Sequence, residues 1–95
     1  MEDEQDEPTT GCVLVVEDNP INQLLVRRQL GRLGYDSVVV DNGIAALELF
    51  PTASAGVILM DWQLPGIDGL ETTRRLRTYE RDHGLPRTPV IAMTA

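Results

Sequence analysis

Four polar residues of this sequence stand directly after short apolar runs. They are Glu17, Asp18, Asp61 and Thr94. If the apolar runs are parallel strands, their carboxyl ends meet at one edge of the sheet, which is where open α/β proteins bind ligands. The pattern therefore predicts that three carboxylates and one hydroxyl share a site.

The residue types at this site indicate one kind of chemistry. Clustered carboxylates raise one another's pKa values unless a cation lies between them. Magnesium, held by one or two carboxylates and several waters, suits such a cluster. Magnesium beside a spare carboxylate is typical of phosphoryl transfer, and a carboxylate oxygen can be the nucleophile that forms an acyl phosphate. We therefore expect a magnesium-dependent phosphoryl-transfer site.

Alternating strands and helices must position these residues. Buried strands are predicted at residues 12–16, 37–40, 57–60 and 89–93. Helices are predicted at residues 20–33, at residues 43–50 and from the turn-rich segment 64–69 to about residue 79. Asn19-Pro20 begins the first helix with a cap residue and a proline, and Gly34 ends it. Val26, Leu30 and Leu33 lie at i, i+4 and i+7 of this helix, the spacing of one apolar face. This alternation predicts a parallel α/β sheet with right-handed crossovers.

Composition excludes several classes of function. The net charge is −7, but residues 2–7 supply five of the fifteen acids, whereas residues 11–95 carry ten acids against eight arginines. We interpret residues 1–10 as an acidic disordered tail or linker, and no basic cluster favours nucleic acid. Cys12 is the only cysteine, so an internal disulfide is impossible. No apolar run reaches the ~20 residues of a membrane span, which predicts a cytoplasmic protein without membrane contact by this segment.

Several motifs resemble those of one family, the receiver domain of two-component response regulators. They are VLVVEDN at 13–19, DNG with AAL at 41–47, LMDWQLPGIDG at 59–69 and PVIAMTA at 89–95. The stretch EDNPINQLLV at 17–26 is most similar to receivers of hybrid sensor histidine kinases.

The resemblance implies a role for each site residue. Asp61 matches the aspartate that takes a phosphoryl group from the phosphohistidine of a histidine kinase. Glu17 and Asp18 match the acidic pair that binds Mg²⁺, with Asp18 as the more direct ligand. Gln63 matches the position whose backbone carbonyl completes the metal site, and Thr94 matches the switch hydroxyl. A histidine phosphotransfer domain is a possible second partner.

The resemblance also implies a flavodoxin-like three-layer α/β/α fold with strand order 2-1-3-4-5. The sequence departs from the family after residue 95, where a helix, a fifth strand and a last helix would follow. We therefore predict a truncated receiver domain at residues 11–95, with order 2-1-3-4, the first helix on one face and the next two on the other. The family's lysine on the fifth strand has no counterpart, because this sequence contains no lysine.

Two other classes of protein need residues that this sequence lacks. A dinucleotide-binding domain would need a glycine-rich turn after the first strand, and EDNPIN has none. An aspartyl phosphatase would typically need a second carboxylate two residues after the nucleophile as its acid/base, and Gln63 occupies that position. A receiver fragment that is not phosphorylated and acts only as an interaction module is the alternative. In either case the isolated domain is not expected to be an enzyme, and a hybrid histidine kinase is a possible parent.

Four further residues are expected to have structural roles. We expect Met60 in the core, Trp62 at the rim of the site and His83 on the surface. Gly69 is interpreted as a turn residue of the segment that follows Asp61.

Overall fold

A computed structural model describes residues 12–93 of the chain. These residues form four strands and three helices, in the order β1 (Cys12–Val16), α1 (Pro20–Arg32), β2 (Asp36–Val40), α2 (Gly43–Ala53), β3 (Val57–Asp61), α3 (Gly69–Asp82) and β4 (Val90–Met93). All pairs of neighbouring strands are parallel, and the strand order is β2-β1-β3-β4. The predicted topology is confirmed for this part of the chain.

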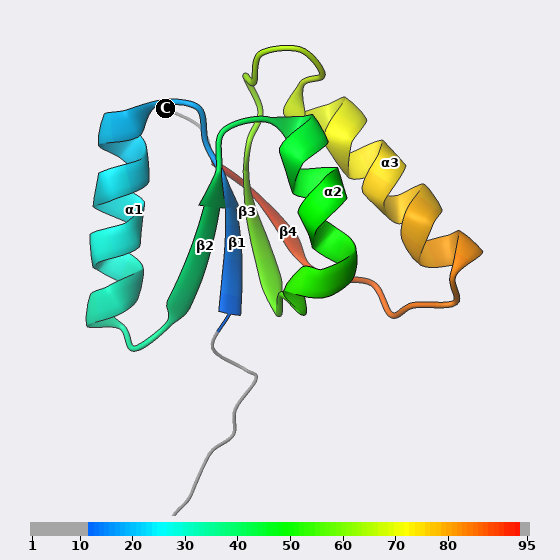
Figure 1. The fold of residues 1–95 in the computed structure, drawn as a ribbon, viewed down its shortest axis with the longest axis horizontal. Helices are drawn as coiled ribbons and strands as arrows, with labels where there is room; N and C mark the ends of the chain where they lie inside the picture. Colours follow the sequence, from blue (N-terminus) through cyan, green and yellow to red (C-terminus); the bar gives the residue numbers. More distant parts are fainter. Residues whose placement is uncertain (1–11, 94–95) are drawn as a thin grey trace, which may run out of the picture.

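The helices lie on both faces of the sheet. Figure 1 shows α1 on one side of the strands, and α2 and α3 together on the other. This is the predicted three-layer arrangement. No helix within residues 12–93 has both the length and the apolar character that crossing a membrane requires. The predicted acidic tail at residues 1–10 and the predicted switch residue Thr94 lie outside the described residues.

The continuous apolar run of β1 is explained by its position between β2 and β3. Val13, Leu14, Val15 and Val16 are all buried, because neighbouring strands and helices cover both faces of this strand. The core is completed by apolar residues of α2, β3, α3 and the segment after β3, namely Ala46, Ile58, Met60, Leu64 and Leu76. Met60 is thus a core residue, as expected.

Each helix begins at a polar cap. The Asn19 side chain accepts hydrogen bonds from Ile21 N and Asn22 N, the Asn42 side chain accepts one from Ala45 N, and that of Asp68 accepts one from Glu71 N. These caps satisfy backbone donors that have no partner inside the helix. They also fix where the chain turns after β1, β2 and the β3–α3 segment.

Several boundaries differ from the prediction. Helix α2 continues to Ala53, with Pro51 in its last turn, and Ser54 ends it in a left-handed conformation (φ 50°). Helix α3 continues to Asp82, where the N–H of the cap residue His83 bonds Tyr79 O at 3.1 Å. Strand β4 begins one residue later than predicted, because the Pro89 nitrogen has no hydrogen to donate to the ladder.

The apolar spacing of α1 was partly misleading. Val26 and Leu30 are half-buried, but Leu33, the third residue of the predicted apolar face, is 71% exposed. The helix ends at Arg32, so Leu33 occupies the cap position and leaves the inner face.

Candidate functional site

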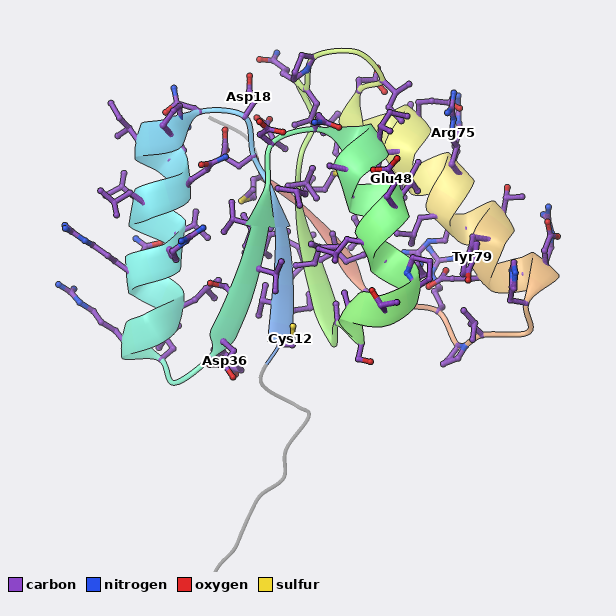
Figure 2. All side chains as sticks on the ribbon, in the orientation of Figure 1. Cys12, Asp18, Asp36, Glu48, Arg75 and Tyr79 are labelled. Atoms are coloured by element: carbon purple, nitrogen blue, oxygen red, sulfur yellow. The ribbon has the colours of Figure 1, made fainter. Side chains whose placement is uncertain are left out.

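The structure brings the three predicted carboxylates together at the carboxyl end of the sheet. One ligand oxygen of each of Glu17, Asp18 and Asp61 can be chosen so that all three lie within 4.8 Å of one another. This follows from the register, because Val16 of β1 lies opposite Met60 of β3, so the next residues of both strands are neighbours. Figure 2 shows Asp18 at this end of the sheet.

Glu17 is the buried member of the cluster. Its carboxylate Oε2 accepts a hydrogen bond of 3.0 Å from Asn19 N, and its carbonyl accepts one of 2.6 Å from Gln23 Nε2. Burial raises the pKa of Glu17 above its ordinary value. The hydrogen bond from Asn19 partly offsets this rise in pKa, and the nearby negative charge of Asp61 adds to it. Because Oε2 is engaged, Glu17 has its other oxygen to offer to a metal or to a metal-bound water.

Asp18 and Asp61 are more accessible than Glu17. Asp18 is exposed, whereas Asp61 is half-buried as the last residue of β3. Oδ1 of Asp61 accepts a hydrogen bond of 3.0 Å from Gln63 N. This bond fixes the orientation of the carboxylate and ties it to the backbone that precedes the loop into α3.

The cluster lies in a cleft of about 780 Å³ between α1 and the ends of β3 and β4. Its lining residues are Glu17, Asp18, Asn19, Asn22, Leu25, Val26, Gln29, Asp61, Trp62, Gln63 and Met93. Among residues 12–93, this lining contains three acidic side chains and no basic one. The donor set of carboxylate oxygens, without a neighbouring cation from the protein, fits a hard divalent ion such as Mg²⁺.

Comparison with known protein families identifies the family of this chain. The family model of the response regulator receiver domain matches residues 13–95. The chain belongs to this family. It is therefore a receiver domain of two-component signalling, as the motifs indicated.

Similar proteins include kinases and isolated receivers. The sensor histidine kinase GacS of Pseudomonas protegens is 43% identical over 84 residues, which are 87% of this chain and 9% of that protein. The receiver domain of a Pseudomonas aeruginosa sensor histidine kinase, solved with magnesium coordinated in its active-site cleft, is 40% identical with a TM-score of 0.80. This match covers 90% of the present chain and 67% of that receiver.

A third similar structure contains a partner. The co-crystal of a Saccharomyces cerevisiae histidine phosphotransfer signalling protein and the receiver domain of its downstream response regulator matches at 31% identity and a TM-score of 0.79. The match covers 88% of this chain and 63% of that chain. The receiver thus spans a small part of the histidine kinase and about two thirds of these solved chains.

The predicted site residues can now be placed. Glu17, Asp18, Asp61 and Gln63 line one cleft of the receiver, and Met93, which precedes Thr94, lines it too. Trp62 is 37% exposed and also lines the cleft, as expected for a rim residue. His83 is exposed and stacks on Tyr79, with 3.9 Å between ring centroids.

Sequence reasoning missed the contribution of α1. Asn22, Leu25, Val26 and Gln29 line the same cleft as the Glu17 carboxylate. Their i, i+3, i+4, i+7 spacing places them on one helix face, so the sequence did contain a signal. It did not show which face is turned toward the cleft.

Proposed function

We propose that this receiver is a phospho-accepting module, in which Asp61 takes a phosphoryl group from a phosphohistidine with the help of Mg²⁺. The observation that carries the proposal is the convergence of three carboxylate oxygens within 4.8 Å in an open cleft. A cluster of this kind favours a bound divalent cation, and it leaves a carboxylate positioned for attack.

Asp18, Asp61 and the backbone carbonyl of Gln63 would hold the metal directly, and Glu17 directly or through water. The exposure of Asp18 and the second oxygen of Glu17 support these roles. When bound, the ion supplies positive charge to the phosphoryl oxygens, which the lining of the cleft lacks among the described residues.

The transfer is an in-line displacement at phosphorus. Asp61 Oδ2 attacks, because Oδ1 is held by Gln63 N. The new P–O bond forms as the P–N bond to the donor imidazole breaks, and its electron pair stays on the imidazole nitrogen, which then takes a proton from solvent. The product is an acyl phosphate on Asp61. We propose that the Thr94 hydroxyl then turns toward this phosphoryl group.

The donor is proposed to be a histidine kinase or a histidine phosphotransfer domain that docks beside the cleft on α1. Ile21 is 70% exposed, and Leu24 and Leu25 are about half exposed on the same part of this helix. Leu25 also lines the cleft, so the apolar surface adjoins the acceptor. We place the reaction in the cytoplasm, where ATP for kinase phosphorylation is present, and propose a sensor histidine kinase as the parent.

A second candidate is an interaction module that is never phosphorylated. The observation that favours it is the lack of a basic side chain in the cleft lining among residues 12–93. The two candidates differ in one property, the ability to form an acyl phosphate.

Incubation of the chain with phosphoramidate and MgCl₂ separates the two candidates. We expect a mass gain of one phosphoryl group that requires Mg²⁺, is removed by hydroxylamine and is absent in Asp61→Asn. Asp36→Asn, at the far end of the sheet, is the matched control and should be labelled normally (Figure 2). A chain that binds Mg²⁺ but gains no phosphoryl group would support the interaction module instead.

A further inference from the structure

Helix α3 begins in direct contact with the backbone that carries the acceptor. Gly69, its first residue, is buried, and Gly69 N donates a hydrogen bond of 3.1 Å to Trp62 O. A Cβ atom built on Gly69 would lie 2.5 Å from Asp61 O, 2.8 Å from Trp62 Cα and 2.9 Å from Trp62 Cε3. Real Cβ atoms essentially never make contacts under 3.0 Å, and two of these three atoms belong to the backbone.

The need for glycine here is steric. The described glycines with positive φ are Gly34, Gly66 and Gly84, and Gly69 is not among them. Gly69 is the first residue of α3, which corrects its interpretation from the sequence as a turn residue. A side chain is excluded because α3 approaches the end of β3 too closely for a Cβ atom.

The close contact between Gly69 and the backbone of residues 61–62 joins the two ends of the segment that shapes the site. Residues 62–68 leave β3 and return to it, and the Gly69 N to Trp62 O bond closes this loop. The backbone at residues 61–63 both orients the Asp61 carboxylate, through Gln63 N, and carries the Gln63 carbonyl. A shift of this backbone would therefore move two of the proposed metal-binding groups at once.

Helix α3 has little room to move away. Thr72 and Leu76 are fully buried on the same helix, and the Thr72 hydroxyl donates to Asp68 O at 2.7 Å. Where α2 meets this segment, a Cβ atom on Gly43 would collide with Thr72 Oγ1 and with the Ile67 side chain. The start of α3 is thus packed between α2 and the backbone of Asp61 and Trp62.

We propose that Gly69 is a positioning residue for the phosphoacceptor site: its missing side chain lets α3 hold the backbone of residues 61–63 where the Asp61 carboxylate and the Gln63 carbonyl face the same ion. The inference rests on the proposed function. In Gly69→Ala the methyl group displaces this backbone. Because misplacement by about 1 Å can cost a factor of 100 in rate, both magnesium affinity and the rate of acyl phosphate formation should fall on the order of 10- to 100-fold.

The test compares three glycine-to-alanine variants by the magnesium dependence of thermal unfolding. Gly31→Ala is the matched control, because Gly31 lies within α1 and its added Cβ would meet nothing within 4 Å. Gly43→Ala is the second, because its collisions involve Thr72 and Ile67 and neither Asp61 nor Trp62. The rise in Tm with MgCl₂ reports the dissociation constant of the folded state even where a variant lowers the folded fraction.

We expect the rise in Tm with MgCl₂ to be strongly reduced in Gly69→Ala, parent-like in Gly31→Ala and much less affected in Gly43→Ala. Amide chemical shifts of residues 61–63 should also change in Gly69→Ala. Parent-like magnesium dependence in Gly69→Ala, or an equal loss in Gly43→Ala, would overturn the proposal. If the parent chain binds Mg²⁺ but takes no phosphoryl group, the proposed function fails, while the magnesium comparison still decides the role of Gly69.

Discussion

The backbone N–H of Gln63 donates a hydrogen bond of 3.0 Å to Oδ1 of Asp61, two residues earlier in the chain. This bond engages one carboxylate oxygen and distinguishes it from the other. We therefore predict that Oδ2 is the oxygen that attacks in the proposed transfer. It also makes Asp61→Asn an informative variant, because an asparagine can keep the bond through its own Oδ1 while losing the nucleophilic oxygen.

Magnesium binding is predicted to depend on Asp18. Trp62 is the only tryptophan and lines the cleft, so its fluorescence should respond to the ion. Removal of one exposed carboxylate in Asp18→Ala should weaken magnesium binding roughly 10-fold or more, by analogy with the 10- to 100-fold losses seen for even indirect metal contacts. The measurement is a titration of Trp62 fluorescence with MgCl₂.

Asp36→Ala is the control for this titration. Asp18 and Asp36 lie at opposite ends of the sheet (Figure 2), so the control removes the same charge far from the cleft. Asp36→Ala should titrate like the parent. An unchanged response of Asp18→Ala to magnesium would show that the ligand assignment is wrong.

The connection between α3 and β4 is predicted to depend on a buried ion pair. Glu80 is buried, accepts from Arg77 Nη1 at 2.8 Å and from Thr88 N at 2.7 Å, and the same Arg77 nitrogen donates to Thr88 O at 2.8 Å. Glu80→Gln removes the charge and one acceptor, so it should lower the free energy of unfolding by about 1–3 kcal/mol. Glu71→Gln, which affects the exposed pair with Arg75 on the same helix, should cost about 0.5 kcal/mol or less.

The effect of Glu80→Gln should depend on pH. Burial alone would raise the pKa of Glu80, but the hydrogen bonds from Thr88 and Arg77 outweigh it, so the pKa lies below its ordinary value. A lowered carboxyl pKa contributes stability that is complete above the pKa of the unfolded chain and is lost as pH falls through the pKa of the folded state. Urea unfolding at neutral and acidic pH should therefore show the difference between parent and variant narrowing in acid. A difference that widens in acid would refute this account of Glu80.

Docking of the phosphohistidine donor is predicted to involve the first turn of α1. Ile21→Ala should slow phosphoryl transfer from a phosphorylated histidine phosphotransfer domain by roughly 10-fold, the effect of losing an apolar contact worth somewhat over 1 kcal/mol. The rate with phosphoramidate should not change, because Ile21 is not among the residues that line the cleft. Rapid-quench transfer assays with both donors measure the two rates.

Leu33→Ala is the control for the docking surface. Leu33 is as exposed as Ile21 but lies at the other end of the helix, about 18 Å away along its axis. It should transfer normally with both donors. Equal losses in Ile21→Ala and Leu33→Ala, or a loss with phosphoramidate as well, would contradict a specific docking site at the first turn.

Much of the fold was predictable because local signals agreed with one another. The apolar run before Glu17 is buried as the β1 strand, and Asn19 caps α1 at the predicted place. The convergence of Asp61 with Glu17 and Asp18 was also predictable, because parallel strands bring their carboxyl ends to one edge. The roles of these residues, and that of Thr94, stay predictions.

What the sequence did not show depends on how elements approach one another. The exposure of Leu33 follows from where α1 ends, and the cleft-lining face of α1 follows from how this helix packs on the sheet. The same holds for Gly69, whose requirement for glycine arises from the distance between α3 and the backbone of Asp61. Such distances are set by packing between segments far apart in the chain, and residue type alone does not reveal them.

The most direct test of the account is to map the phosphorylated residue. The chain is treated with phosphoramidate and MgCl₂, the acyl phosphate is reduced with borohydride, and the resulting homoserine is located by tandem mass spectrometry. We predict conversion at residue 61 alone, dependent on Mg²⁺ and absent in Asp61→Asn. Conversion at any other acidic residue, or label that persists in Asp61→Asn, would contradict the assignment of Asp61 as the phosphoacceptor.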